Sequence, residues 1–189
     1  MAIVTAADVV TYSDISTSAA GVLASGLIPI VQDRINSYCN NMFVSDDIYM
    51  QDELTFTSSA TVTAGTGNDW VDHGFKDLDE IYIYNSRRND GYYTVTSVTT
   101  VTMTLGTGTV TDEYSGASIL VSLVRWPDSV KYAAAQMVKF DYDDRPSRAA
   151  GLRSQSLGPR SESYGEAGAF GYPQDILGLL DNYRVARLM

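Results

Sequence analysis

The spacing of hydrophobic residues changes twice along the chain, from a helical period to a strand period and back. In residues 5–43, and again from residue 127 onward, apolar residues recur three or four positions apart, which is the period of an α-helix. Residues 52–124 instead alternate apolar and polar positions and are rich in β-branched and aromatic residues, which is typical of half-buried strands. The pattern therefore predicts an α+β protein in which a β-rich segment separates two helical segments.

The N-terminal helical segment contains two predicted helices. Thr5 followed by Asp8 has the spacing of a capping box, so a short helix is expected to begin there. A longer helix is predicted from apolar positions three or four residues apart, which are Leu27, Val31, Ile35, Tyr38 and Met42. Pro29 suits the first turn of that helix, so the sequence favours a break or kink near Ser25–Pro29, with one kinked helix from Ser16 as the alternative.

The C-terminal helical segment also predicts two helices, one on each side of a polar loop. The first begins at Pro127, and its apolar face consists of Trp126, Val130, Ala133, Met137 and Phe140. The last begins at Pro173, and its apolar stripe consists of Ile176, Leu179, Leu180 and Tyr183. The loop between them includes residues 151–165, "GLRSQSLGPRSESYG", which are polar, basic and rich in serine and glycine.

The β-rich segment predicts five to seven short strands joined by turns, such as the hairpin turn at residues 89–91. This pattern indicates a small antiparallel β-barrel or sandwich. Neither helical segment alone has enough apolar surface for a core, so the two are expected to pack together as a small bundle of about four helices. The predicted domains are a helical core of residues 1–48 and 126–189 and an inserted β domain of residues 49–125.

The charge of the chain is acidic overall and unevenly distributed. Its 189 residues include 13 basic and 23 acidic side chains, which argues against free-standing nucleic-acid binding. Residues 145–160 nevertheless contain four arginines and no acid, so this segment suits an acidic partner, unless it is an ordinary solvated loop. The sequence predicts neither a signal peptide nor a membrane-spanning segment, and we expect a protein made in a reducing cytoplasm.

The sequence offers little that points to catalysis. His73 is the only histidine and Cys39 the only cysteine, so no Cys-based zinc site is predicted and Cys39 is expected to be a buried small hydrophobe. Asp69, Asp72 and Asp77 lie near His73, but their spacing does not fit an EF-hand, and a surface turn is the preferred interpretation. The polar loop also lacks the spacing of a phosphate-binding loop. We therefore expect an interaction or structural protein, not an enzyme, with no cofactor and no metal.

Tyrosine is the one residue type whose abundance suggests a binding surface. The chain has 13 tyrosines. Four of them lie in predicted strands, namely Tyr82, Tyr84, Tyr92 and Tyr93. We expect these four to form half-buried cross-strand pairs, with a sugar- or protein-binding face as the alternative.

Four pieces of sequence occur here in an order that resembles the head-tail connector proteins of tailed bacteriophages, also called adaptor or head-completion proteins. The pieces are "VTYSDIS…LIPIVQDRINSYCNNMF", "PDSVKYAAAQMVKFDYDDR", "SQSLGPRSESY" and "YPQDILGLLDNYRVARL". Small members of that family have a much shorter connection in place of the β-rich segment. That segment contains "GF…DLDEIYIYNSRRNDGYYTVTSV", which resembles a small β-module of other phage structural proteins.

The resemblance implies an α-helical core whose copies assemble into a ring, typically of twelve, beneath the portal protein. Such a ring extends the DNA channel without sequence-specific DNA binding, receives the tail or a second head-completion protein, and lies in the neck of the virion. Contacts with the portal or a neighbouring subunit are expected from Arg145, Arg148, Arg153, Leu157, Arg160, Tyr164, Tyr183, Arg184 and Arg187. The alternative is a binding module of tail or adhesion type, in which the β insert recognises a carbohydrate or a protein.

Overall fold

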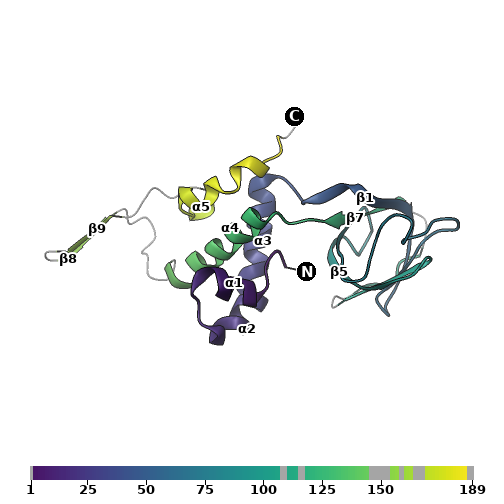
Figure 1. The fold of residues 1–189 in the computed structure, drawn as a ribbon, viewed down its shortest axis with the longest axis horizontal. Helices are drawn as coiled ribbons and strands as arrows, with labels where there is room; N and C mark the ends of the chain where they lie inside the picture. The colour runs from purple at the N-terminus through teal and green to yellow at the C-terminus, as the bar shows by residue number, and fades with distance from the viewer. Residues whose placement is uncertain are drawn as a thin grey trace. The chain divides into compact units, whose positions relative to one another are not determined.

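The computed structural model describes residues 2–106, 110–114, 118–144, 154–157, 160–163 and 169–186. The chain forms two compact units, one of Met42–Arg125 and one of Ala2–Asn41 together with Trp126–Met189. We call them the β unit and the helical unit. Buried apolar side chains lie inside each of them, and Figure 1 shows the strands of the first and the helices of the second.

The helical unit is built from α1 (Ala6–Ser13), α3 (Ile28–Cys39) and α4 (Asp128–Lys139), with the short helices α2 (Ala20–Val22) and α5 (Gln174–Gly178). Other helical turns lie beside them, of 3-10 type at Thr17–Ala19, Ala169–Gly171 and Asp181–Tyr183 and of π type at Leu23–Leu27 and Phe140–Asp144. The predicted capping box is confirmed at the start of α1. The Asp8 N–H donates to the Thr5 hydroxyl at 3.1 Å, and the Thr5 N–H donates to the Asp8 carboxylate at 2.8 Å.

A π turn stands where the sequence predicts a break or kink near Ser25–Pro29. Proline has no N–H, and its ring crowds the carbonyl four residues earlier, so a regular α-helix cannot pass through it undistorted. Over Leu23–Leu27 the backbone widens, and the Ile28 N–H donates to the Leu23 carbonyl, five residues back. The chain therefore stays helical from Thr17 to Cys39, as one distorted helical stretch.

Helix α4 is buried on more than one face. Its predicted apolar face is confirmed, since Trp126, Val130, Ala133, Met137 and Phe140 are all buried. Ala134, Ala135 and Val138 are buried as well, and α1, α3 and α5 all pack against this helix. The small alanine side chains allow these neighbours to approach closely.

The last helix is much shorter than predicted. It ends at Gly178, and a 3-10 turn follows at Asp181–Tyr183. Glycine in a helix costs about 0.5–1 kcal/mol of stability relative to alanine. A Cβ atom built at Gly178 would have no neighbour within 4 Å, so no tight packing at this position offsets that cost. The buried residues are Leu177 and Leu180, so the predicted stripe is wrong at the other three positions, which are half-buried. In the described residues the bundle therefore consists of α1, α3 and α4, of eight or more residues each, and the short α5, which agrees with the predicted bundle of about four helices.

In the described part of the β unit, seven strands form one antiparallel sheet. They are β1 (Val44–Glu53), β2 (Thr55–Thr57), β3 (Thr61–Thr63), β4 (Glu80–Tyr84), β5 (Gly91–Val98), β6 (Thr102–Leu105) and β7 (Ser118–Val124). Their order across the sheet is β1-β7-β4-β5-β6-β3-β2. The predicted turn at residues 89–91 is confirmed, because it joins the paired strands β4 and β5.

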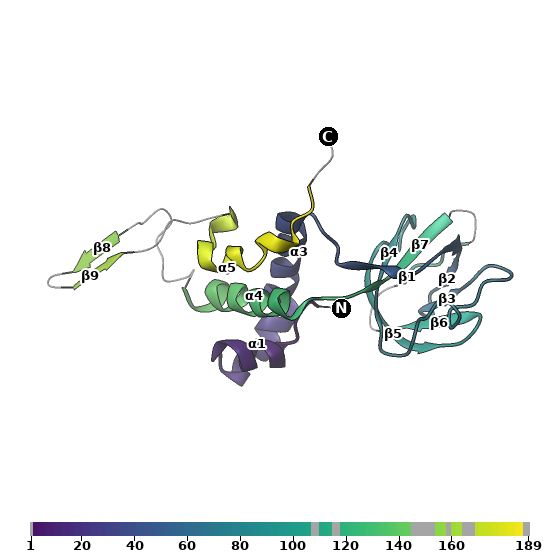
Figure 2. The same ribbon diagram turned by 45° about the horizontal axis from the view of Figure 1, so that its top comes forward.

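The prediction of a closed barrel or a sandwich is wrong. A barrel requires its two edge strands to pair with each other, and a sandwich requires two separate sheets. Here a single sheet ends in β1 and β2, which do not pair with each other in the described residues. Only one residue, Leu54, separates these two edge strands in the sequence. The edges are therefore connected by the turn of the chain at this residue and not by hydrogen bonds between the strands. Beyond β2 the described residues form one isolated bridge, between Phe56 and Glu113. Figure 2 shows that the sheet is strongly curled.

The curled sheet surrounds one apolar core. Inward-facing strand residues supply most of it, among them Met50, Ile81, Ile83, Val95, Met103 and Val121. Trp70 and Phe75, from the connection between β3 and β4, fill its interior with their rings 5.5 Å apart in a T-shaped arrangement. The indole N–H of Trp70 donates to the Val101 carbonyl at 3.2 Å, so its polar atom is satisfied.

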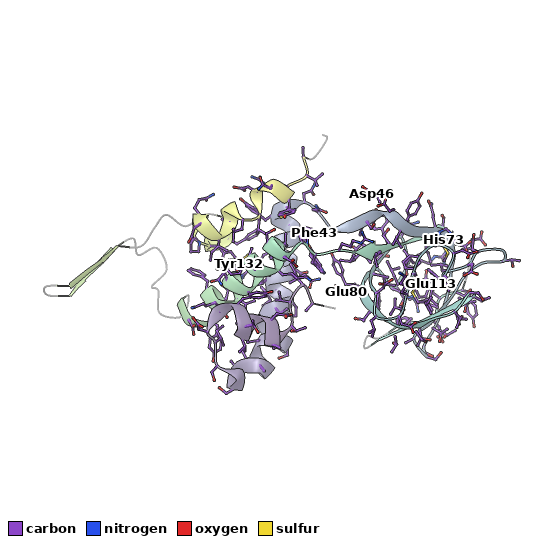
Figure 3. The ribbon with its side chains drawn as sticks, viewed as in Figure 1. Phe43, Asp46, His73, Glu80, Glu113 and Tyr132 are labelled. Carbon is purple, nitrogen blue, oxygen red and sulfur yellow. The ribbon has the colours of Figure 1, made fainter. Side chains whose placement is uncertain are left out.

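Glu113 is a buried acid of the β unit, at 8% exposure (Figure 3). Its carboxylate accepts hydrogen bonds from the Ser86 hydroxyl at 2.7 Å, the Arg87 N–H at 2.9 Å and the Asn89 amide at 3.1 Å. Burial opposes ionisation, but these hydrogen bonds outweigh it, so the pKa of Glu113 is lowered. Asn89 also bonds the backbone of Thr111 in both directions, and the network therefore holds the β4–β5 turn against residues 110–114.

Replacing Glu113 with glutamine tests this network. Glu113→Gln removes the charge from three hydrogen bonds, and we expect a loss of unfolding free energy on the order of 1–3 kcal/mol at neutral pH. Because the pKa is lower in the folded state, the carboxylate stabilises the fold above its unfolded pKa, and this contribution is lost as the pH falls through the folded pKa. Urea denaturation in a pH series should therefore show a steeper acid loss in the wild type than in the variant.

The matched control is Glu53→Gln, because Glu53 is exposed at the end of β1. This control should keep the stability and the acid profile of the wild type. The role given to Glu113 is wrong if its glutamine variant keeps them too.

Candidate interaction surfaces

A buried carboxylate, Asp141, is held by side chains from two other parts of the helical unit. Asp141 lies in the π turn after α4, and its side chain is 5% exposed. Arg34 of α3 donates from Nη1 to Asp141 Oδ2 at 2.6 Å, and the Tyr172 hydroxyl donates to the same oxygen at 2.6 Å. Arg34 also donates to the Tyr172 hydroxyl, and its guanidinium lies 5.5 Å from the centre of that ring. We call these three residues the Asp141 cluster.

The Asp141 cluster anchors both ends of residues 145–168. Asp141 precedes this segment by four residues and Tyr172 follows it by four, and both bind Arg34 of α3. Burial first, and then the hydrogen bond to Asp141, raise the pKa of Tyr172 to about 12, so its hydroxyl remains a donor at neutral pH. The described residues on either side of the polar segment between α4 and α5 are therefore held together in one cluster.

Two of the predicted interaction residues, Tyr183 and Arg184, contact their own unit. The Tyr183 hydroxyl lies 2.6 Å from the Ser129 hydroxyl at the start of α4. The Arg184 guanidinium lies 4.9 Å from the centre of the Tyr38 ring and 3.9 Å from the carboxylate of Asp181. The Tyr38 hydroxyl donates to that same carboxylate at 2.6 Å, and these contacts hold the C-terminal segment on α3. The Arg184 side chain is still 57% exposed, so it remains accessible to a partner.

The other predicted interaction residues lie in or beside the polar segment and at the C-terminus. Those outside the described residues are Arg145, Arg148, Arg153, Tyr164 and Arg187. Leu157 and Arg160 belong to β8 (Ser154–Leu157) and β9 (Arg160–Ser163), which pair antiparallel with these two residues opposite each other. The loop predicted at residues 151–165 is therefore in part a β-hairpin. Its strands "SQSL" and "RSES" are short and almost wholly polar, so no alternation of apolar residues marks them in the sequence.

The residues considered for metal binding lie in turns of the β unit. His73 is exposed, and its Nδ1 lies 2.9 Å from the carbonyl oxygen of Tyr49. Asp69 accepts hydrogen bonds from N–H groups of its own turn, and Asp77 accepts one from the Val98 N–H at 2.7 Å. No group of three or more His, Cys, Asp or Glu side chains in the described residues is arranged to hold a metal ion. Nor does any helix in that part of the chain have the length and apolar character to cross a membrane.

Cys39 is buried at the end of α3, which confirms its predicted place in the core. Its Sγ lies 3.8 Å from the carbonyl of Leu180, and the Val185 N–H donates to the Cys39 carbonyl at 2.8 Å. Burial raises the pKa of the thiol to about 11, so the nucleophilic thiolate is scarce at neutral pH.

The outward side of the sheet carries tyrosines in a row that crosses four strands. The register places Tyr49 of β1 beside Ser122 of β7, and Ser122 beside Tyr82 of β4. Tyr82 in turn lies beside Tyr92 of β5. Sequence neighbours of these residues point into the core, so the tyrosines point away from it. With the next row the surface comprises Tyr49, Tyr82, Tyr84, Tyr92 and Leu120, which we call the tyrosine face.

The predicted cross-strand pairing holds for only part of this set. The rings of Tyr82 and Tyr92 lie 4.7 Å apart, and the Tyr92 hydroxyl donates to the Met42 carbonyl at 3.2 Å. Tyr84 is 58% exposed and is not half-buried as predicted, while Tyr93 points to the opposite side and packs on the core. The sequence also missed Tyr49, which is 49% exposed, because only the strand register brings it to this face.

The helical unit has an exposed aromatic pair of its own. The rings of Tyr12 in α1 and Tyr132 in α4 lie 6.0 Å apart in a T-shaped arrangement, and Figure 3 labels Tyr132 on its helix. Gln136 joins the same two helices by donating to the Tyr12 carbonyl at 2.8 Å. Neither ring belongs to an apolar face that the sequence predicted, so the spacing of apolar residues did not point to them.

The chain was also compared with known proteins. No protein-family model and no curated protein matches it. The function therefore has to be inferred from the order of the elements and from the surfaces that they present.

Removing the hydroxyl of Tyr172 tests whether the Asp141 cluster stabilises the helical unit. Tyr172→Phe keeps the ring but removes one hydrogen-bond donor from a buried carboxylate, and we expect a loss of about 1–3 kcal/mol in unfolding free energy. Urea denaturation followed by circular dichroism measures it. Tyr114→Phe is the control, because Tyr114 is 89% exposed, and it should change stability by less than about 0.5 kcal/mol. Equal stability of the two variants would show that the Tyr172 hydroxyl contributes nothing to the cluster.

Proposed function

We propose that the protein is a structural subunit without catalytic activity, a head-tail connector of a tailed bacteriophage. In this role its copies form a ring beneath the portal protein, extend the DNA channel and receive the tail or a second head-completion protein. The observation that carries the proposal is the order of elements in the helical unit. A capped α1, a long α3, α4, a polar segment with a hairpin and a short α5 follow one another, in the order of the four sequence pieces that resemble that family.

The hairpin of β8 and β9 supports an assembling role. It contains four residue pairs, and an isolated two-stranded hairpin is at best marginally stable in water. A neighbouring subunit or the portal that covers the hairpin would supply the missing stabilisation. Because the Asp141 cluster anchors both ends of the segment, the hairpin can bind a neighbour while the helical unit keeps its fold.

The exposed aromatic pair of the helical unit gives further support. A ring interface is heterologous, so one face of a subunit meets a different face of the next subunit. Tyrosines are enriched in such interfaces, and Tyr12 and Tyr132 are 45% and 44% exposed.

Assembly with the portal protein of the same phage tests the proposal. The full-length protein, alone and mixed with portal, is examined by light scattering and negative-stain microscopy, and rings are expected. Monomers that form rings only on the portal also agree with a connector. A protein that stays monomeric at high concentration and never joins the portal contradicts the proposal.

Substitutions in the polar segment give a sharper prediction. We expect Arg153→Ala, Leu157→Ala and Arg160→Ala together to weaken assembly by about tenfold or more, with the thermal unfolding of the subunit unchanged. A matched control replaces two exposed arginines and one exposed aliphatic residue elsewhere, namely Arg87, Arg88 and Val101, and should assemble normally. If the first set unfolds the isolated subunit, the segment belongs to the core and does not serve assembly.

The tyrosine face favours a second candidate function, a recognition module in which the β unit binds a carbohydrate or a protein. The Arg125 N–H donates to the Phe43 carbonyl at 2.9 Å, so the two ends of the β unit are adjacent and a short glycine linker can replace the unit. We expect the shortened chain to join the portal, because the helical unit carries the connector elements. Lost docking, together with glycan binding by the excised β unit, would favour the second candidate.

A further inference from the structure

We propose that the tyrosine face of one copy binds residues 145–160 of a second copy, which we call the arginine segment. The inference rests on the proposed function, because it names the surface on which this segment docks within the ring. Three observations carry it: the exposure of the face, its charge, and the complementary charge of the segment.

The tyrosine face carries four tyrosines, and the rings of two of them, Tyr82 and Tyr92, lie side by side. Tyr49 of β1 and Tyr84 of β4 are 49% and 58% exposed. Tyr82 lies two residues before Tyr84 in β4, and its ring is 4.7 Å from that of Tyr92 in β5. The four tyrosines belong to β1, β4 and β5 of one sheet, with β7 between β1 and β4, so they form a firm surface with little entropy left to lose on binding. Tyrosines in such a setting are common anchors of protein interfaces.

The charge of the face is negative. None of the four strands that form it, β1, β7, β4 and β5, contains a lysine, arginine or histidine, whereas they contain five carboxylates. Two of these lie on the outward side by register, since Glu53 is opposite Ser118 and Glu80 is opposite Thr94. The β unit as a whole has twelve acidic and four basic side chains. A second tyrosine face or a phosphate-bearing partner is therefore repelled, and a cationic partner is attracted.

The arginine segment has the chemistry that such a face selects. It contains Arg145, Arg148, Arg153 and Arg160 and no acid. Guanidinium groups stack on tyrosine rings within about 6 Å and form bidentate pairs with carboxylates. Since the two complementary surfaces are different parts of the same chain, each copy can bind one neighbour through its face and the other through its segment. This is the head-to-tail arrangement that closes into a ring.

Truncating the exposed tyrosines is the first arm of the test. We expect the full-length chain with Tyr49→Ser and Tyr84→Ser to self-assemble about tenfold or more weaker than the wild type, by sedimentation equilibrium. The matched control replaces Leu78 and Tyr114, which are 78% and 89% exposed and lie off the face, and should assemble normally. Because the contact includes charge pairs, wild-type assembly should also weaken as salt rises.

Charge reversal in two separate chains is the second arm. The face-reversed chain has Gln51→Lys, Glu53→Lys and Glu80→Lys, and the segment-reversed chain has its four arginines changed to glutamate. Each chain alone should fail to assemble, whereas an equimolar mixture should assemble again, because every reversed surface then meets one of opposite charge. The control makes the same change in charge at exposed positions elsewhere, with Asp33→Lys, Asp72→Lys and Gln174→Lys.

The outcomes separate this inference from the proposed function. If the reversed chains and the tyrosine variant assemble like the wild type, the face is unused and the inference fails, while the connector function stands. A further chain carries both sets of reversals. If this chain assembles but the equimolar mixture does not, the face binds the segment of its own chain, and a second copy is not the occupant of the face. If the wild type never assembles with portal, the proposed function fails as well. Thermal melts check that each chain folds. If a charge-reversed chain does not fold, the assembly of the tyrosine variant alone tests whether the face is used.

Discussion

Asp141 can be buried as a charged group because Arg34 and Tyr172 reach the same oxygen. Taking a lone carboxylate out of water costs several kcal/mol, and removing one partner of a buried pair leaves that cost uncompensated. The order of the helical unit beyond α4 follows from this requirement. Tyr172 has to return to α3 after the polar segment, and it brings with it the short α5 and the residues that cover Cys39 and Tyr38. The ends of the polar segment are thereby held together.

The β unit obeys the same rule with a different buried acid. Glu113 lies at the sheet edge, and the turn between β4 and β5 supplies its donors, so the turn and residues 110–114 are held in one place. In both units a buried acid needs hydrogen-bond donors from a distant part of the chain, and this need fixes the position of the segment that supplies them. Neither network involves the tyrosine face. Truncating the exposed tyrosines of that face therefore leaves both networks intact.

Local signals in the sequence predicted much of the secondary structure. The capping box at Thr5, the apolar face of α4 and the turn at residues 89–91 depend on residues within one or two turns of each other, and all were confirmed. Where a competing local effect was underestimated, the prediction was wrong, as at Gly178, which ends α5 early. Polar strands of four residues carry no alternation, which is why the β8–β9 hairpin was predicted as a loop.

The sites of the main helices and strands, the acidic balance of the β unit and the basic run at residues 145–160 can be predicted from the chain alone, because these are properties of neighbouring residues. Three features depend instead on the folded chain. The sheet stays open in the described residues, Asp141 meets Arg34 from 107 positions away, and Tyr49 lies on the same side of the sheet as Tyr82 and Tyr92. Each of these outcomes depends on strand register or on long-range pairing. A slip of one residue in a strand would turn the tyrosines of that strand toward the core, and the apolar alternation within the strand opposes this slip. Which strand lies beside which is set only by long-range pairing.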